Sequence, residues 1–318
     1  MCFSALVEAK VTKLSKRFDA QIDLPLFEAL FARRLQDPSI KLLHAIEVEF
    51  LASTDSAAGH IRDLIHQQQS QQREKWQADL SKQQKRLQDA NAALQRKVTA
   101  KAQNDQRIAT SKIESLENNL RRLDDMKDRP RDSRVFPMVW APVVIQCNGE
   151  NFIRPMRYHC RPAGKPAAYD QRYPCLYNAR RDNLTRFWQG QFGVTHGVVV
   201  VQKFYENVSA HHYAHRPLVD GETDQNLVVE YEPEEGKDMT VACLWSHWQD
   251  ASESLDSFAA VTDEPPADVA ATGHDRCIVP LKSENVSKWL DPERYSAAQL
   301  DALLADREAF HFQHRPAS

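Results

Sequence analysis

The sequence predicts an α+β protein with a mixed, mostly antiparallel β core, flanking helices and an inserted antiparallel helical hairpin. Residues 24 to 52 repeat apolar side chains at helical spacing, and the stretch from Ile61 to Arg129 contains neither glycine nor proline. After Pro130 the pattern changes to short β-branched runs bounded by turn residues. Strands that cluster between helices, without regular alternation, favour this class over a doubly wound parallel sheet.

The individual elements follow from local patterns in chain order. Two amphipathic helices, "LPLFEALFARRL" and "SIKLLHAIEVEFLA", are separated by the breaker "DPS". Five runs have the composition of strands: "FPMVWAPVVI", "HGVVVVQKFYEN", "NLVVEYEP", "TVACLWSHW" and "SFAAVT". The stretch "DPERYSAAQLDALLADREAF" predicts a helix close to the C-terminus.

The stretch between these two regions has the pattern of a coiled-coil hairpin. Leucines recur every seven residues at Leu80, Leu87 and Leu94, and a 3-4-3 spacing follows at Ile113, Leu116, Leu120 and Leu123. We expect two helices of roughly 30 residues, each about 45 Å long, with the turn between Ala90 and Gln106. We therefore predict an inserted hairpin over 54–130, and one domain formed by 1–53 and 131–318.

The hairpin also differs in charge from the rest of the chain. Residues 61–129 carry 15 Lys and Arg against 10 Asp and Glu, which gives +5. The whole chain has a net charge of -3, so the remainder is -8. Three roles are open for this segment: a projection only, a seam for homodimerisation, or a basic arm for DNA or a repair protein. We favour a hairpin that recruits a replication or repair protein, because charges at coiled-coil flanks are usually solvated.

Composition excludes several classes of function. No stretch approaches the roughly 18 to 20 apolar residues of a membrane span, and no signal peptide is evident, so we expect a cytoplasmic protein. The six cysteines form no CxxC pair and show no zinc spacing. "HHYAH" at 211–215 lacks a carboxylate or cysteine pattern to complete a metal site. Neither a Walker loop nor GxGxxG is present, so we expect no metal and no cofactor.

The N-terminus carries a distinctive chemical group. Cys2 follows the initiator methionine, and removal of Met1 is favoured by a small second side chain. The mature chain would then begin with an α-amine and a thiol on one residue. Such a 1,2-aminothiol captures an aldehyde, because the amine forms a Schiff base and the thiolate closes a thiazolidine ring on the same carbon.

Three further stretches accompany this cysteine: "YNARRDN" at 177–183, "KFYEN" at 203–207 and "GHDRCIVPL" at 273–281. Together they resemble the SRAP family, the SOS-response-associated peptidases understood as abasic-site processing proteins. The resemblance covers residues 1 to about 53 and about 133 to 300, and includes "FPMVWAPVVI" and "KWLDP". The matching motif positions are Cys2, Asn178, Arg180, Glu206 after Tyr205, His274 and Arg276.

This resemblance implies a function and a role for each motif residue. The protein would bind single-stranded DNA, crosslink to abasic sites through Cys2, and lose Met1 by family-type autoproteolysis, as an SRAP-type peptidase with lyase-like chemistry. Glu206 would assist opening of the sugar ring, and His274 would shuttle protons. Asn178 would hold the α-amine and the sugar oxygen. Arg180 and Arg276 would contact flanking phosphates. On DNA the protein would be associated with the nucleoid.

The chain also departs from the family pattern. Many members begin Met-Cys-Gly-Arg, whereas Phe3 and Ser4 follow here, so a phosphate contact from that arginine is missing. Lys16, Arg17 or the insert could replace it. Where relatives carry Trp-Gly, this chain reads "MRYHCRPAG", which makes Tyr158 a candidate stacking platform and Arg157 a candidate DNA contact.

Two other functions fit parts of the sequence. Cys2 could be the N-terminal nucleophile of an amidohydrolase that acts on small molecules, with its own α-amine as the base. Alternatively, the chain could be a non-catalytic protein in which the basic coiled coil binds DNA or a partner. A heat-stable adduct with abasic single strands distinguishes the crosslinking function from both.

Overall fold

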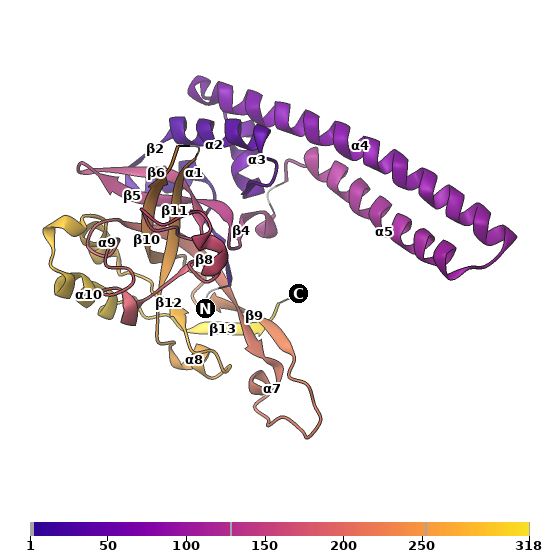
Figure 1. The fold of residues 1–318 in the computed structure, drawn as a ribbon. Coiled ribbons are helices and arrows are strands. Elements are labelled where there is room, and N and C mark those ends of the chain that lie inside the picture. Colours follow the sequence, from indigo (N-terminus) through magenta and orange to yellow (C-terminus); the bar gives the residue numbers. More distant parts are fainter. Residues whose placement is uncertain (1–2, 128, 252, 318) are drawn as a thin grey trace. The chain divides into compact units, whose positions relative to one another are not determined.

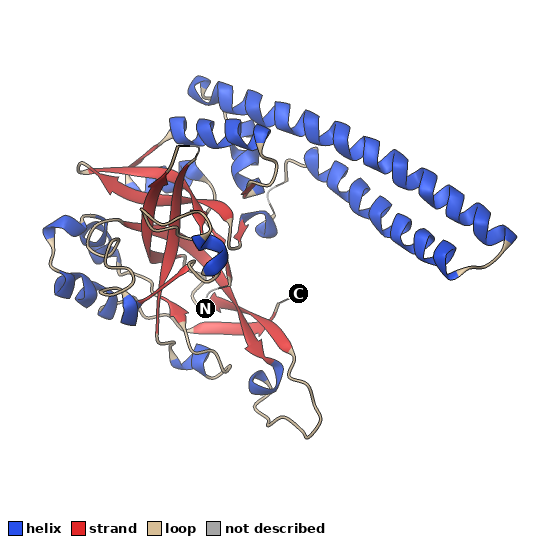
Figure 2. Cartoon of the chain, viewed as in Figure 1, coloured by secondary structure: helices blue, strands red, loops and turns tan. Residues whose placement is uncertain are grey.

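The computed structural model describes residues 3–127, 129–251 and 253–317. The chain divides into two compact units, each described separately below. Unit 1 comprises Met1–Leu30, Ser39–Glu49 and Arg129–Ser318, and unit 2 comprises Phe31–Pro38 and Phe50–Asp128. Strands are concentrated in the first unit, and the second is helical (Figure 2).

Five long strands close on themselves at the centre of unit 1. They are β5 (Val139–Cys147), β6 (Glu150–Tyr158), β8 (His196–Ser209), β10 (Met239–Gln249) and β11 (Ser254–Asp263). The order β8-β10-β11-β6-β5 returns to β8, because β5 also pairs with β8. All these pairs are antiparallel except β11 with β6.

Gly197 lies where this closure is tightest. It pairs with Ile145 of β5 on one side and Cys243 of β10 on the other. A Cβ at this position would lie 3.0 Å from a Val143 methyl group and 3.2 Å from the Cys243 sulfur. The absence of a side chain therefore lets three strands approach one another at this point.

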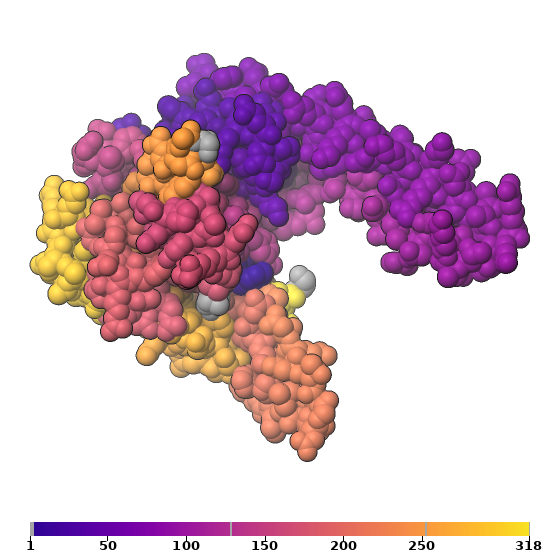
Figure 3. Space-filling model, in the orientation of Figure 1, coloured from indigo at the N-terminus to yellow at the C-terminus, as the bar shows by residue number. Residues whose placement is uncertain are grey.

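Shorter strands extend the sheet on both sides of the closed core. β8 continues into a long hairpin with β9, which then pairs with β13, and this hairpin projects beyond the rest of the unit (Figure 1, Figure 3). The strands outside the core are β1 (Ser4–Val7), β2 (Ala20–Ile22), β3 (Lys41–Leu42), β4 (Arg134–Val135), β7 (Asn178–Arg180), β9 (Asn226–Pro233), β12 (Cys277–Ile278) and β13 (Phe312–Pro316).

Helices of unit 1 are mostly short. They are α1 (Val11–Phe18), α6 (Tyr169–Arg172), α7 (Ala210–Tyr213), α8 (Ala267–Ala270), α9 (Ser283–Leu290) and α10 (Ala297–Ala305). α9 buries Trp289, whose indole N–H donates to the Gly197 carbonyl at 3.0 Å. α10 begins at the capping box of Ser296 and Gln299. Thus α9 anchors the C-terminal part of the chain to the closed strands.

Two helices contribute residues to both units, α2 (Leu24–Gln36) and α3 (His44–Ala52). The long hairpin of unit 2 consists of α4 (Gly59–Arg96) and α5 (Ala100–Leu123). Arg73 pairs with Asp124 at 2.6 Å, and Arg86 pairs with Asp105 at 2.5 Å. These ion pairs join the two helices near the base and near the tip of the hairpin.

The structure confirms the predicted α+β class and the inserted helical hairpin. The turn at 97–99 falls inside the expected window, and Leu80, Leu87 and Leu94 are half-buried along α4. The five predicted runs overlap β5, β8, β9, β10 and β11. Sequence patterns missed β6, which contains Pro155 and four charged or polar residues, Glu150, Asn151, Arg154 and Arg157.

Candidate active site

The N-terminal segment lies beside the strand that carries Glu206. Cys2 is outside the described residues, and the description begins at Phe3. β1 pairs with β8 in a register that sets Ser4 opposite Tyr205. The Phe3 backbone N–H donates to the Tyr205 carbonyl and to Oε2 of Glu206, each at 3.2 Å. This pairing places the residue next to Cys2 within hydrogen-bonding distance of the Glu206 carboxyl group.

Glu206 is an ionisable side chain in a fully buried position. Its exposed fraction is 0%, although carboxylates are almost never fully buried without partners. Burial raises the pKa of Glu206 well above its ordinary value, and the hydrogen bond from the Phe3 N–H opposes that rise. The carboxyl group therefore holds a proton at a pH where an exposed glutamate has lost it.

His274 lies against the same carboxyl oxygen. Its Nε2 is 3.4 Å from Oε2 of Glu206, and its Nδ1 is 2.8 Å from the Arg276 carbonyl oxygen. The Arg276 N–H also lies 3.2 Å from Nδ1, but the carbonyl contact is shorter, and it favours a ring proton on Nδ1 because a carbonyl only accepts. Burial lowers the pKa of His274, which keeps the ring neutral and leaves Nε2 free of a proton.

The raised pKa of Glu206 and the lowered pKa of His274 indicate a pair that shares one mobile proton. A protonated Glu206 faces an unprotonated Nε2 at 3.4 Å. Hydrogen bonds in unliganded sites are often long and shorten when substrate binds. The pair is therefore suited to deliver a proton to a buried reacting atom and to take it back.

Asn178 is the third motif residue, and it is buried on β7. This strand pairs in parallel with Ala260 to Thr262 of β11. Its side-chain oxygen and nitrogen are both buried, and neither has a hydrogen-bond partner in the part of the chain that the structure describes. Buried polar groups are nearly always paired, so this amide has donors and an acceptor available to a ligand.

Arg180 and Arg276 converge on one carboxylate. On one side, Thr262 of β11 pairs with Arg180 of β7. On the other side, it pairs with Ile278 of β12, the strand that begins just after Arg276. The Arg180 guanidinium is 2.7 Å from Asp182, and the Arg276 guanidinium is 4.0 Å from the same carboxylate. Asp182 therefore holds two guanidinium groups close to one anionic position.

The structure places Tyr158 and Arg157 differently from the expected DNA contacts. Tyr158 is only 2% exposed, and its ring stacks on Phe258 at a centroid distance of 5.0 Å. Arg157 is buried; it donates to the His159 carbonyl at 3.1 Å and pairs with Asp170 at 2.9 Å. Neither residue is available as a DNA contact, because Tyr158 is packed against Phe258 and Arg157 is paired with Asp170.

Sequence reasoning missed a close contact behind His274. Gly273 has a φ of +89°, and a Cβ there would lie 2.7 Å from the Cβ of His212. The "HHYAH" segment, which includes the end of α7, thus packs against the residue before His274. Asp182 was also missed, although its position two residues after Arg180 in "NARRDN" was a usable signal.

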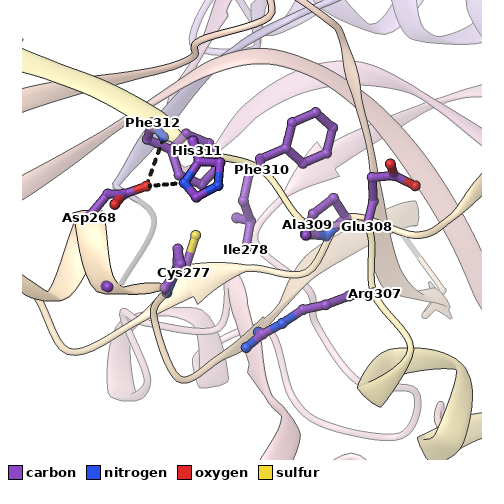
Figure 4. Close-up of a pocket in the computed structure, with 12 residues that line it drawn as sticks. Asp268, Cys277, Ile278, Arg307, Glu308, Ala309, Phe310, His311 and Phe312 are labelled. Carbon is purple, nitrogen blue, oxygen red and sulfur yellow. Dashed lines mark hydrogen bonds and ion pairs between the residues drawn. The ribbon is translucent and has the colours of Figure 1, made fainter.

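A separate cavity of about 240 Å³ lies beside β12. Its lining includes Cys277, Arg307 and Phe312 (Figure 4). Asp268 at its edge accepts a hydrogen bond from the Phe312 N–H at 3.1 Å. Asn178, Glu206 and His274 do not line this cavity. Within the described residues, no group of three or more His, Cys, Asp or Glu side chains is placed to hold a metal ion.

Comparison with protein families supplies the deciding observation. The family model described as SOS response associated peptidase (SRAP) matches residues 61–318, which is most of the chain. The chain belongs to the SRAP family. Membership associates this SRAP protein with the SOS response to DNA damage and with peptidases by family name. Among the described residues, no helix is both long and apolar enough to cross a membrane.

Solved structures resemble this SRAP protein at low sequence identity. A Bacteroides thetaiotaomicron protein has 15% identity and a TM-score of 0.45, and the match covers 58% of this chain and 78% of that protein's chain. A Bordetella bronchiseptica protein has 16% identity and a TM-score of 0.44, with 58% and 87% covered. A phage-related Bordetella bronchiseptica protein has 18% identity and a TM-score of 0.43, with 58% and 81% covered. No curated protein matches the chain significantly.

Proposed function

We propose that this SRAP protein binds single-stranded DNA and forms a covalent thiazolidine crosslink between Cys2 and an abasic site. The observation that carries the proposal is the buried Glu206, which accepts the Phe3 N–H at 3.2 Å and faces His274 at 3.4 Å. This arrangement brings an acid–base pair to the residue that follows Cys2. A general acid near an N-terminal aminothiol is suited to the capture of an aldehyde.

The reaction balances without a cofactor. The abasic sugar opens from its cyclic hemiacetal to an aldehyde at C1′, as the C1′–O4′ bond breaks, O4′ gains a proton and the C1′ hydroxyl loses one. The α-amine of Cys2 adds to C1′, and loss of one water molecule gives a Schiff base. The Cys2 thiolate then attacks C1′, which forms the C–S bond while the nitrogen takes up a proton.

Glu206 and His274 act in the proton transfers. Glu206 donates a proton to the sugar oxygen during ring opening and to the departing hydroxyl during Schiff-base formation. His274 Nε2 accepts and returns protons by way of Glu206. Such transfers contribute about 10² to 10⁴ in rate when the group has the required protonation state. The raised pKa of Glu206 and the lowered pKa of His274 both support these assignments.

Asn178 and the two arginines position the substrate. Asn178 uses its unpaired amide to hold the α-amine and a sugar oxygen. Arg180 and Arg276 contact the phosphates that flank the lesion, where a phosphate replaces the Asp182 carboxylate between them. The remaining family-type step is removal of Met1, which exposes the α-amine of Cys2. The protein would do this work on DNA in the cytoplasm and would shield the lesion from strand cleavage.

A denaturing gel tests the proposal directly. The purified protein is incubated with a labelled single strand that carries one abasic site, and with the intact strand as a control. We expect a heat-stable, slowly migrating band with the abasic strand only. The absence of that band would reject the crosslinking function, and a band with intact DNA would reject the specificity for the lesion.

A further inference from the structure

Arg134 is a cation held at the N-terminal segment. It lies on β4 and pairs with Leu6 of β1. Its Nε and Nη2 donate to Oγ of Ser4 at 3.0 and 2.9 Å. The guanidinium carbon is 3.5 Å from the ring centroid of Tyr205 and 4.9 Å from that of Phe136. One hydroxyl and two aromatic rings thus fix this guanidinium next to the strand position that precedes Glu206.

No carboxylate among the described residues lies within ion-pair distance of Arg134. Its neighbours differ in this respect. Lys203 pairs with Glu230 and Glu232, and Arg315 pairs with Glu230 at 2.7 Å. Arg134 is half-buried, and burial lowers its pKa, although the charges of Tyr205 and Glu230 oppose that shift. Buried charges are normally paired, so the position favours an incoming anion.

We propose that Arg134 binds the DNA phosphate adjacent to the abasic sugar. The anchoring residue, Ser4, is close in sequence to Cys2, and the stacking residue, Tyr205, directly precedes Glu206. A phosphate held here therefore lies next to the reacting sugar. A guanidinium presents a planar fork that matches phosphate oxygens, and two of its nitrogens are already fixed. This inference rests on the proposed function and adds a contact that its residues do not supply.

Arg134 also supplies a positive charge close to position 4, where many family members carry an arginine. Ser4 stands at that position, and its hydroxyl orients the Arg134 guanidinium. Arg17, one of the expected substitutes, is used elsewhere, because it donates to Thr240 at 2.8 Å and faces Asp238. Lys16 is exposed on α1, and no described contact directs it toward the N-terminal segment. The charge near Ser4 is therefore supplied from β4.

The test measures binding separately from chemistry. The probe is a single strand with a tetrahydrofuran abasic analogue, which has no aldehyde and forms no crosslink. In a series of strands, one phosphate at a time is replaced by a neutral methylphosphonate. With the natural protein, neutralising the contacted phosphate next to the analogue should weaken binding about tenfold. Arg134→Gln should weaken binding of the unmodified strand about tenfold and remove the extra effect of that methylphosphonate.

Salt dependence and a matched variant complete the test. Arg134→Gln should lower the slope of log affinity against log salt by about 0.7, the value for one single-strand phosphate. Arg315→Gln removes a nearby arginine that is paired with Glu230, and it should leave the slope and the methylphosphonate pattern unchanged. If Arg134→Gln does not fold, Arg134→Lys replaces it and should at least halve the methylphosphonate effect, because lysine lacks the fork.

A folded Arg134 variant that keeps the natural slope and the natural methylphosphonate pattern would overturn the inference. Crosslinking to a true abasic strand is followed in parallel with the natural protein. If the protein binds the analogue through Arg134 but forms no adduct, the proposed chemistry fails and the phosphate contact stands. If the adduct forms and the Arg134 variants bind like the natural protein, the proposed chemistry stands and the phosphate contact is rejected.

Discussion

Replacing Glu206 by glutamine separates the chemistry of the site from its architecture. The side chain is fully buried, and its Oε2 accepts the Phe3 N–H at 3.2 Å. A glutamine has the same shape, and its amide oxygen can accept the same hydrogen bond. It cannot deliver a proton in the way a carboxylic acid does. Glu206→Gln should therefore keep the fold and DNA binding while it slows the formation of the adduct.

The expected loss of rate follows from the role assigned to Glu206. A positioned general acid contributes about 10² to 10⁴, so the single-turnover rate at saturating abasic DNA should fall by that range. The measurement is the growth of the heat-stable band with time on a denaturing gel. Affinity for an intact strand serves as the control and should not change. A rate within about threefold of the natural one would refute the role of Glu206, since a real general acid contributes far more.

The same variant makes a second prediction, about stability and pH. Burial raises the pKa of Glu206 above 4.5, its ordinary value. The folded protein then holds a proton that the unfolded chain releases, so this group's contribution to stability is complete below pH 4.5 and is lost as the pH rises through the folded pKa. Between the two pKa values the loss reaches about 1.4 kcal/mol per pH unit. Glutamine has no such loss.

Chemical unfolding at several pH values measures this difference. Relative to the natural protein, Glu206→Gln should gain unfolding free energy as the pH rises from acid toward neutral, and it should gain nothing near pH 4.5. A difference that stays constant with pH would contradict a buried, protonated Glu206. A rate loss that accompanies the stability gain would show that this carboxyl group is kept for catalysis at a cost to the fold.

Three further predictions concern other parts of the molecule. Asp182→Asn should strengthen binding to single strands several-fold and steepen its salt dependence by about 0.7, because Arg180 and Arg276 lose a competing carboxylate; weaker binding would show that Asp182 only orients the arginines. Gly197→Ala should lower the unfolding free energy by about 1 to 3 kcal/mol in denaturant titrations, since the new Cβ meets neighbours at 3.0 to 3.2 Å; an unchanged midpoint would contradict the close approach of the strands. Replacing residues 77–120 by a short turn keeps the hairpin base at Arg73 and Asp124 and should leave the dependence of crosslinking rate on DNA concentration unchanged, whereas loss of chemistry in a folded variant would assign the hairpin a part in the site.

Local periodicity was sufficient to predict the long helices and four of the five strands of the closed core, and it failed where distant residues complete a pattern. β6 reads poorly as a strand because Arg154, Pro155 and Arg157 interrupt its apolar side chains. In the folded chain Arg154 pairs with Asp23 at 2.9 Å, and Arg157 pairs with Asp170. Asp23 is far away in sequence and Asp170 lies on α6, so no short window of sequence could reveal that the charges of β6 are compensated.

The candidate site shows the same limit more strongly. Motifs named Glu206 and His274 separately, but their approach to 3.4 Å depends on how β8 and the segment before β12 pack together. Tyr158 was a candidate stacking platform, but its ring is buried against Phe258. In the sequence, an aromatic residue in an arginine-rich stretch has the same pattern in both cases. No local sequence pattern singled out Arg134, because its position depends on the contact with Ser4 across the β1–β4 pair.

The location of the covalent bond tests the central claim most directly. The adduct with an abasic strand is trimmed with nuclease, digested and sequenced by mass spectrometry. The proposed mechanism predicts the sugar remnant on the N-terminal peptide, bound at Cys2 after loss of Met1, and predicts that Cys2→Ala forms no stable adduct while it folds normally. A remnant on a lysine, or an adduct of equal stability with Cys2→Ala, would contradict thiazolidine formation in this protein.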